Sequence, residues 1–406
     1  MNPGYLKVKL ALEGVRLGAS LQADDIEKQI IHRIEGDYQG VMMILPEDIW
    51  AYVPIVDHPE PHLYTLVRER DTFFIQRDEE RIPIRLVHYH KTNCKNPCPN
   101  QDIQSLKTGF IHGKFISFSP LSCCPSLGWR TYCPHQGQHH TISGKHLALE
   151  AVLEDIQKAV DNDWGEFVHL HVGLVATEDR GITLLEPYIT AIKRRFNTLI
   201  AVEIDPPTTN DWIDRTYALG VDSISYNIDI FNPPLFQKIH PEREALIGRE
   251  RYLEALAYAA EIFPAGTVTS QLILGLEPKE WTLTGIDTLT KLRIVPLLPL
   301  PLLGTWARKE IARGDLLSLE DIIEIGAHLY WAVKKNRVRV NWMNFGGHIL
   351  TPLDGRFFAA EKARLQVALH NIYTSKLGGK VQVGFSNLRR RLRVKRVMES
   401  LDSSGL

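Results

Sequence analysis

The sequence has 406 residues, 44% hydrophobic and 23% charged, and this composition excludes a chain without a folded core. Its 47 Lys and Arg nearly balance 48 Asp and Glu, so the net charge of −1 predicts no general attraction to nucleic acid or to an anionic membrane. The five cysteines form no disulfide framework, and we expect free thiols or metal ligands in a reducing compartment, by default the cytoplasm.

The N-terminal stretch is apolar, but Lys7 and Lys9 interrupt it, so we expect no signal peptide. The most apolar run, residues 295–306, is too short to span a bilayer and holds three prolines. No contact with a membrane is therefore expected.

Residues 1–110 predict an N-terminal α/β domain. A short helix is expected over residues 21–34, and runs of β-branched and aromatic residues predict strands over 41–45, 72–76 and 82–89. A segment rich in Cys, Pro and Asn, residues 91–102, marks the boundary of this domain.

Residues 111–350 show a regular alternation of apolar strands and amphipathic helices. Strands are predicted over residues 115–119, 167–172, 198–204, 222–228, 267–274, 293–298 and 337–341. Helices are predicted over residues 147–160, 182–196, 210–219, 249–262, 281–291 and 318–335, the last with Ser318 as its N-cap. This alternation is typical of a parallel sheet. Seven strands, with no glycine-rich turn of the dinucleotide-binding type, favour a TIM-barrel-like (β/α) barrel over an open sheet.

Residues 351–406 predict a helical, basic C-terminal extension, with a helix over 359–373 and a strand over 379–385. Six of the eight residues 389–396 are Lys or Arg. Such a run forms a solvated helix face or contacts nucleic acid or a partner.

Polar side chains stand where the predicted strands end, which is where parallel barrels carry their active sites. His169 and His171 lie on one side of a strand, a spacing used by zinc-dependent hydrolases and also by hydrogen-bonded pairs that line a pocket. Asn227 and Asp229 also share a face, where they bind a substrate or fill the barrel as polar plugs. Glu203 ends the strand between these two.

The long segment after the first barrel strand holds Cys123, Cys124 and Cys133. Thiolates gathered at the mouth of a barrel are what an iron–sulfur cluster requires. The alternative is that they are ordinary cysteines in a proline-rich loop.

From residue 115 to residue 341 the chain resembles the radical S-adenosylmethionine superfamily, and within it the biotin synthase-like barrel group. Residues 132–136, Tyr-Cys-Pro-His-Gln, look like the end of the family's Cys-x3-Cys-x2-Cys loop. Residues 220–229 and 251–256 resemble its fourth strand and the following helix. Residues 270–277 and 295–305 resemble its fifth and sixth strands.

The resemblance implies a [4Fe–4S] cluster held by Cys133 together with Cys123 or Cys124. S-adenosyl-L-methionine bound to this cluster would release a 5′-deoxyadenosyl radical that acts on a small-molecule substrate. Ferredoxin or flavodoxin would donate the electron. Asn227, Asp229 and Arg251 would bind the nucleotide or the substrate, and Glu203 a ribose hydroxyl.

The sequence departs from the family pattern in two places. Ser126 and Arg130 stand where the first two cysteines of the motif belong, so a third thiolate comes from using both vicinal cysteines or from Cys94 or Cys98. The Gly-Gly-Glu that follows the family's second strand is replaced by residues 172–174, Val-Gly-Leu.

Two alternatives to an active radical enzyme follow from these observations. One is a degenerate barrel without a cluster that acts as a binding or assembly partner. The other is a metal-dependent hydrolase that uses His169 and His171.

Overall fold

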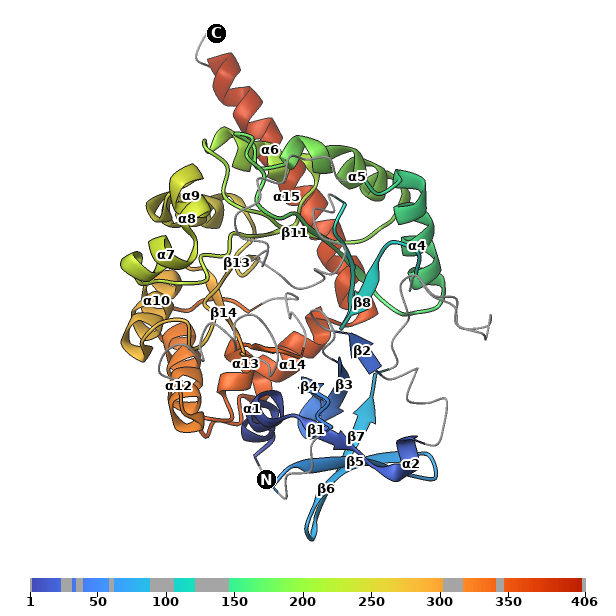
Figure 1. The fold of residues 1–406 in the computed structure, drawn as a ribbon. Helices are drawn as coiled ribbons and strands as arrows, with labels where there is room; N and C mark the ends of the chain where they lie inside the picture. The colour runs from blue at the N-terminus through green and yellow to red at the C-terminus, as the bar shows by residue number, and fades with distance from the viewer. Residues whose placement is uncertain are drawn as a thin grey trace.

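The structure is a computed structural model, and it describes residues 2–22, 31–33, 39–57, 62–87, 106–120, 146–301, 317–340 and 347–403. Over these residues the chain is an α/β protein built on two curled sheets, one of seven described strands at the N-terminus and one of eight that follows it (Figure 1).

The N-terminal sheet is almost entirely antiparallel. Its strands are β1 (Val15–Leu17), β2 (Ile31–Arg33), β3 (Gln39–Leu45), β4 (Ile49–Pro54), β5 (Tyr64–Glu69), β6 (Thr72–Arg77) and β7 (Glu80–Leu86). Among its described strands β1 and β5 pair in parallel, and Val15 of β1 also forms an isolated parallel bridge to Ile55 just beyond β4. The strands predicted over residues 41–45 and 72–76 are confirmed as β3 and β6, and the one predicted over 82–89 is confirmed as β7, although residues 88 and 89 lie outside the described residues. The predicted helix over 21–34 is wrong where the chain is described, because β2 lies within it and helix α2 (Ala19–Gln22) covers only its start.

The second sheet contains six consecutive parallel strands. They are β9 (Phe115–Phe118), β10 (Phe167–His171), β11 (Ile200–Glu203), β12 (Ser223–Ser225), β13 (Val268–Gln271) and β14 (Val295–Pro299). Short antiparallel strands, β8 (Phe110–His112) and β15 (Ile349–Leu350), cover the two edges. The alternation of strands and helices in the sequence therefore predicted the parallel core of this sheet correctly.

The prediction of a closed, fully parallel TIM-like barrel is wrong. β15 pairs with β14 in antiparallel fashion and occupies the edge where a seventh parallel strand would lie. The predicted seventh strand, residues 337–341, is not extended sheet over its described residues, since Arg337 adopts a left-handed φ of 52° directly after a helix. No pairing within the described ranges joins β8 to β15, and the sheet is an open half-barrel.

Amphipathic helices follow the parallel strands and cover the outer face of the half-barrel. They are α4 (Leu149–Asp161), α5 (Ile182–Arg195), α6 (Asp211–Leu219), α7 (Pro233–Ile239), α8 (Pro241–Leu246), α9 (Arg249–Ile262), α10 (Lys279–Lys291) and α12 (Leu319–Lys335). The N-cap predicted for α12 is confirmed, because Ser318 and Asp321 form a reciprocal capping box.

Helix α1 (Pro3–Glu13) joins the two sheets. Its Lys7 is buried and donates to the backbone oxygen of Ile349 at 2.7 Å and to the Asp354 carboxylate at 2.9 Å. Asp354 belongs to helix α13 (Pro352–Gly355), just after β15. A buried ammonium group must have such partners, so the N-terminal residues fix the edge of the half-barrel.

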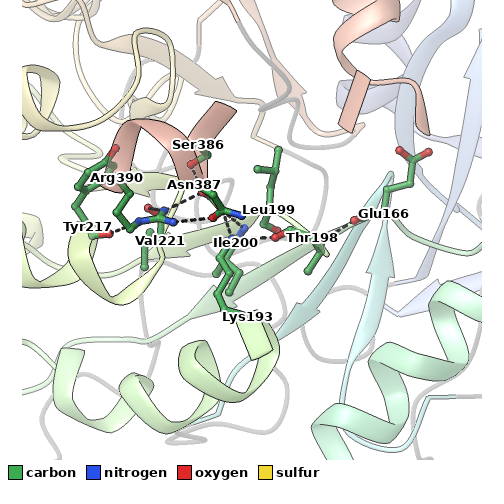
Figure 2. Close-up of polar contacts among 11 residues, drawn as sticks. Glu166, Lys193, Thr198, Leu199, Ile200, Tyr217, Val221, Ser386, Asn387 and Arg390 are labelled. Carbon is green, nitrogen blue, oxygen red and sulfur yellow. Dashed lines mark hydrogen bonds and ion pairs between the residues drawn. The ribbon is translucent and has the colours of Figure 1, made fainter. Parts of the chain in front are cut away.

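The C-terminal segment is helical, with α14 (Arg364–Tyr373) and α15 (Lys376–Ser403). α15 crosses the half-barrel, and its last turns project beyond the other elements (Figure 1). The strand predicted over residues 379–385 is wrong, because tertiary contacts of the helix override the local Val-Gln-Val pattern. Figure 2 shows Arg390 of α15 directed at the end of α6 and the residues that follow it, where Arg390 donates to the backbone oxygens of Tyr217 and Val221.

Candidate functional site

The carboxyl ends of the parallel strands β9 to β14 meet at one edge of the half-barrel, which we call the rim. Parallel βα proteins carry their binding sites at this edge, since the connecting segments leave the strands there. The chemical groups at the rim come from residues distant in the sequence.

Glu203, at the end of β11, lies against two histidines of the neighbouring strand β10. Its carboxylate is 3.6 Å from His169 Nε2 and 3.3 Å from His171 Nδ1. The parallel register pairs His171 with Glu203, so the three side chains share one face of the sheet. Burial raises the pKa of Glu203, but the two adjacent imidazoles outweigh this effect and hold the pKa well below its ordinary value. The site thus contains an ionised carboxylate between two groups that can bind or release a proton.

His348, directly before β15 at the edge of the sheet, lies near enough to Glu203 to feel the charge of its carboxylate. Its backbone oxygen accepts from Leu300, just beyond β14. Burial and the charge of Lys7 lower the pKa of His348 to about 3, while the charge of Glu203 opposes them. The sequence did not predict a role for this residue, whose local signal is a histidine placed between two glycines and the apolar pair of β15.

Asn227 lies two residues beyond β12 and is buried. Its Oδ1 accepts from Ser225 Oγ at 2.6 Å and from the backbone N–H of Gln271 at 3.2 Å. Its Nδ2 has no hydrogen-bond partner among the described residues. A buried amide donor without a partner costs free energy, so this group is a candidate for binding a ligand at the rim.

Asp229 belongs to a buried ionic group that the sequence did not predict. Arg243, from α8, donates to Asp229 at 2.7 Å and forms an ion pair with Asp205 at 3.1 Å. Tyr252 also donates to Asp205, at 2.6 Å. Burial raises the pKa of Asp229 to about 7 although Arg243 opposes this, because one guanidinium must serve two buried carboxylates. Asp229 also has a left-handed φ of 61°, and its backbone still pairs in parallel with Leu272, just beyond β13.

Arg251 lies away from these groups. Its Nε donates to the backbone oxygen of Pro207 and its Nη2 to Asn210 Oδ1, both at 2.8 Å. These bonds tie α9 to the segment after β11. Within the described part of the chain, no hydrogen bond or ion pair joins Arg251 to Glu203 or Asn227.

All five cysteines lie outside the described residues, but the ends of their segments are described. Residues 121–145, which contain Cys123, Cys124 and Cys133, begin just after β9. Pro120 precedes this segment and Leu147 lies just after it, and the Leu147 N–H donates to the Pro120 oxygen at 3.1 Å. Both ends of this segment are therefore anchored at the rim.

The segment before β8, residues 88–105, contains Cys94 and Cys98. A strand parallel to β9 would place this segment at the opposite end of the barrel. β8 is antiparallel instead and pairs Phe110 with Ser117, so the chain enters β8 near the carboxyl end of β9. The segments that carry all five cysteines thus join the described chain on the same side of the half-barrel.

The described ranges contain no group of three or more His, Cys, Asp and Glu side chains arranged to bind a metal ion. His169 and His171 contact Glu203 rather than forming such a group. No helix in the described part of the chain is long and apolar enough to cross a bilayer.

No family model matches the chain. A curated relative is the Bacteriochlorophyllide c C-7(1)-hydroxylase of Chlorobaculum limnaeum, with 24% identity over 175 residues. The match covers 38% of this chain and 44% of the hydroxylase, so the chain spans less than half the length of that protein. The similarity makes the chain a distant relative of a hydroxylase.

Proposed function

We propose that the protein is a radical S-adenosylmethionine-type enzyme that removes a hydrogen atom from a small organic substrate. The observation that carries the proposal is the anchoring at the rim of the segment with Cys123, Cys124 and Cys133, next to polar groups on three successive parallel strands. The resemblance of the barrel motifs to this superfamily supports it, and so does the distant relation to a hydroxylase. A hydroxylase must break a C–H bond, which is the reaction that a carbon radical performs.

The fit of the chain's residues to the cofactors rests on two features. Three thiolates in one rim segment match the demand of a [4Fe–4S] cluster that leaves one iron open. The buried Nδ2 of Asn227 and the Glu203 carboxylate offer a donor and an acceptor for the hydroxyl and amino groups of S-adenosylmethionine or of a substrate. When bound, the cluster and S-adenosylmethionine supply the 5′-deoxyadenosyl radical that takes the hydrogen atom, after one electron arrives from a donor such as ferredoxin or flavodoxin.

The remaining rim residues position and neutralise charge in this proposal. Arg243 holds Asp229 and Asp205 in place beneath the site, and the bonds of Arg251 make it a positioning residue for the segment after β11. His169 and His171 contact Glu203 and can exchange protons with the substrate, whereas burial keeps His348 uncharged. His169, His171 and Glu203 are half-buried, which strengthens their electrostatic interactions relative to groups in bulk water.

Anaerobic reconstitution with iron and sulfide tests the proposal directly. We expect about four irons per chain and broad absorption near 400 nm, typical of thiolate-ligated clusters. With dithionite as reductant, the reconstituted protein should convert S-adenosylmethionine to 5′-deoxyadenosine and methionine. A colourless, iron-free protein after reconstitution would contradict the proposal and favour the degenerate, cluster-free barrel. Stoichiometric zinc in its place would favour the hydrolase.

A further inference from the structure

Helix α15 packs on the half-barrel with a side of mixed character and leaves a row of apolar side chains outside. The inward contacts are made by Gly379, Val383, Ser386 and Arg390, the last two through hydrogen bonds to Asp222. The outward side carries a row of apolar side chains, which we call the α15 stripe: Leu377, Val381, Phe385, Leu388 and Leu392. In ordinary surface helices the apolar side faces the core, so an apolar row on the outer side is unusual.

The stripe is continuous and strongly exposed. Its members recur at intervals of three or four residues, which places them on one side of a helix with 3.6 residues per turn. Leu377 is 74% exposed, Phe385 67% and Leu392 54%. Helix α14, directly before α15, also exposes Leu365, Leu369 and Ile372. An apolar row of this length on a helix surface marks an interaction site.

The charged residues of the segment that carries the stripe are all basic. Residues 362–398 contain ten Lys and Arg and no Asp or Glu. On the helix, Lys380 and Arg391 lie along one border of the stripe and Arg389 along the other, and all three are exposed. The positive charge of this segment is not apparent from the net charge of the whole chain, because the remainder of the sequence is net acidic.

From this stripe and its basic borders we infer that α15 docks the protein on the surface of an anionic lipid bilayer. Apolar side chains enter the boundary between headgroups and acyl chains without needing a complementary groove, and Lys and Arg at the borders reach the phosphate groups. Each basic residue near an anionic membrane surface contributes about 1 kcal/mol. A second copy of the chain is a poorer occupant, since a two-fold contact would bring the same cations against each other. The helix lies on the surface in this docking and does not span the bilayer.

Flotation of the full chain with lipid vesicles tests the inference. We expect binding to vesicles of phosphatidylcholine mixed with phosphatidylglycerol, at least about tenfold weaker binding to phosphatidylcholine alone, and loss of binding at high salt. The double variant Phe385→Ser, Leu388→Ser should abolish binding. Leu246→Ser is the matched control, because Leu246 is an exposed leucine on α8, 44% exposed and outside the stripe.

A second variant separates the charge from the apolar row. Arg389→Glu with Arg391→Glu leaves the stripe intact and should weaken binding to the mixed vesicles by at least about 25-fold, since each 1 kcal/mol is roughly fivefold. Circular dichroism and the unfolding temperature confirm that each variant is folded. Equal binding to both vesicle types, or no binding to either, would overturn the inference. A dimer in solution that the serine variant dissociates would assign the stripe to a second copy instead.

Discussion

The two ends of the half-barrel differ in the ratio of buried cations to buried carboxylates. At the amino end of the strands, Asp222 accepts from the backbone N–H of Ile200 at 2.8 Å, from Lys193 at 2.5 Å and from Arg390 at 3.0 Å. Figure 2 shows Lys193 and Arg390 converging on this point from α5 and α15. One carboxylate has two cations there, and α15 is fixed by it.

At the rim this ratio is reversed, because one cation serves two carboxylates. Asp205 and Asp229 share Arg243, and the Nδ2 of Asn227 has no partner within the described chain. Satisfied networks add stability and rigidity, whereas unsatisfied buried groups cost free energy and persist where a ligand completes them. We infer from this difference that the network at the amino end stabilises the fold, whereas the rim carries the candidate functional site.

Substitution of the rim cysteines should give the largest effect, which is the loss of the iron–sulfur cluster. Cys133→Ser should abolish iron binding, and Cys123→Ser or Cys124→Ser should reduce it severely, because serine keeps the size of cysteine but lacks the soft thiolate that iron prefers. Iron content per chain after anaerobic reconstitution is the measurement.

Cys94→Ser and Cys98→Ser serve as controls in the same experiment and should leave most of the iron. These two variants are a strict test, because β8 is antiparallel to β9. The segment with Cys94 and Cys98 therefore joins β8 near the rim and not at the far end of the half-barrel. Iron lost in these two variants and kept in Cys123→Ser and Cys124→Ser would assign the ligands to residues 88–105.

Asp222→Ala should give the next largest effect, on stability alone. It leaves Lys193 and Arg390 without their carboxylate in a buried position, and removal of one partner from such a group costs about 3–5 kcal/mol. Urea unfolding measures this change in the free energy of unfolding. Asp71→Ala is the control, since the Asp71 side chain is fully exposed and its loss should change stability by less than about 0.5 kcal/mol. A loss below about 1 kcal/mol in Asp222→Ala would show that the amino end is not a stabilising network.

His169→Ala and His171→Ala should change substrate handling at the rim without changing the metal. Each removes a proton-exchanging group beside Glu203, which is worth roughly 10²-fold in turnover. Iron content and 5′-deoxyadenosine formation without substrate should stay at the wild-type level. Zinc that is stoichiometric in the wild type and disappears in either variant, measured by mass spectrometry, would support the hydrolase instead.

The smallest expected effect is a pH dependence from Asp229. Burial raises its pKa to about 7 from 3.8, so its contribution to stability is complete below about pH 4 and is lost as the pH rises through 7. Asp229→Asn cannot ionise and should lack this dependence. The unfolding temperature of the wild type minus that of the variant should therefore fall between pH 4 and pH 8. A difference that is constant over this range would show that Arg243 keeps Asp229 ionised throughout.

Local patterning in the sequence determined the core of the fold. The six parallel strands and the helices between them follow from apolar runs and 3.6-residue periodicity, and the cap of α12 follows from Ser318 and Asp321. The same patterning placed Glu203, His169 and His171 at strand ends, where the register brings them together. These features depend on residues close in the chain, so the sequence states them directly.

Only the tertiary structure decided how the sheet ends and what surrounds its rim. The antiparallel edges β8 and β15 keep the half-barrel open, and their direction depends on connections that carry no periodic signal. His348 and Arg243 reach the site from distant elements, and Arg251 turns to Pro207 instead. Residues 379–385 have the pattern of a strand, yet Arg390 and Ser386 bind Asp222, more than 160 residues away, and hold this segment as a helix. Contacts over such separations reward one packing over another, and no local pattern encodes them.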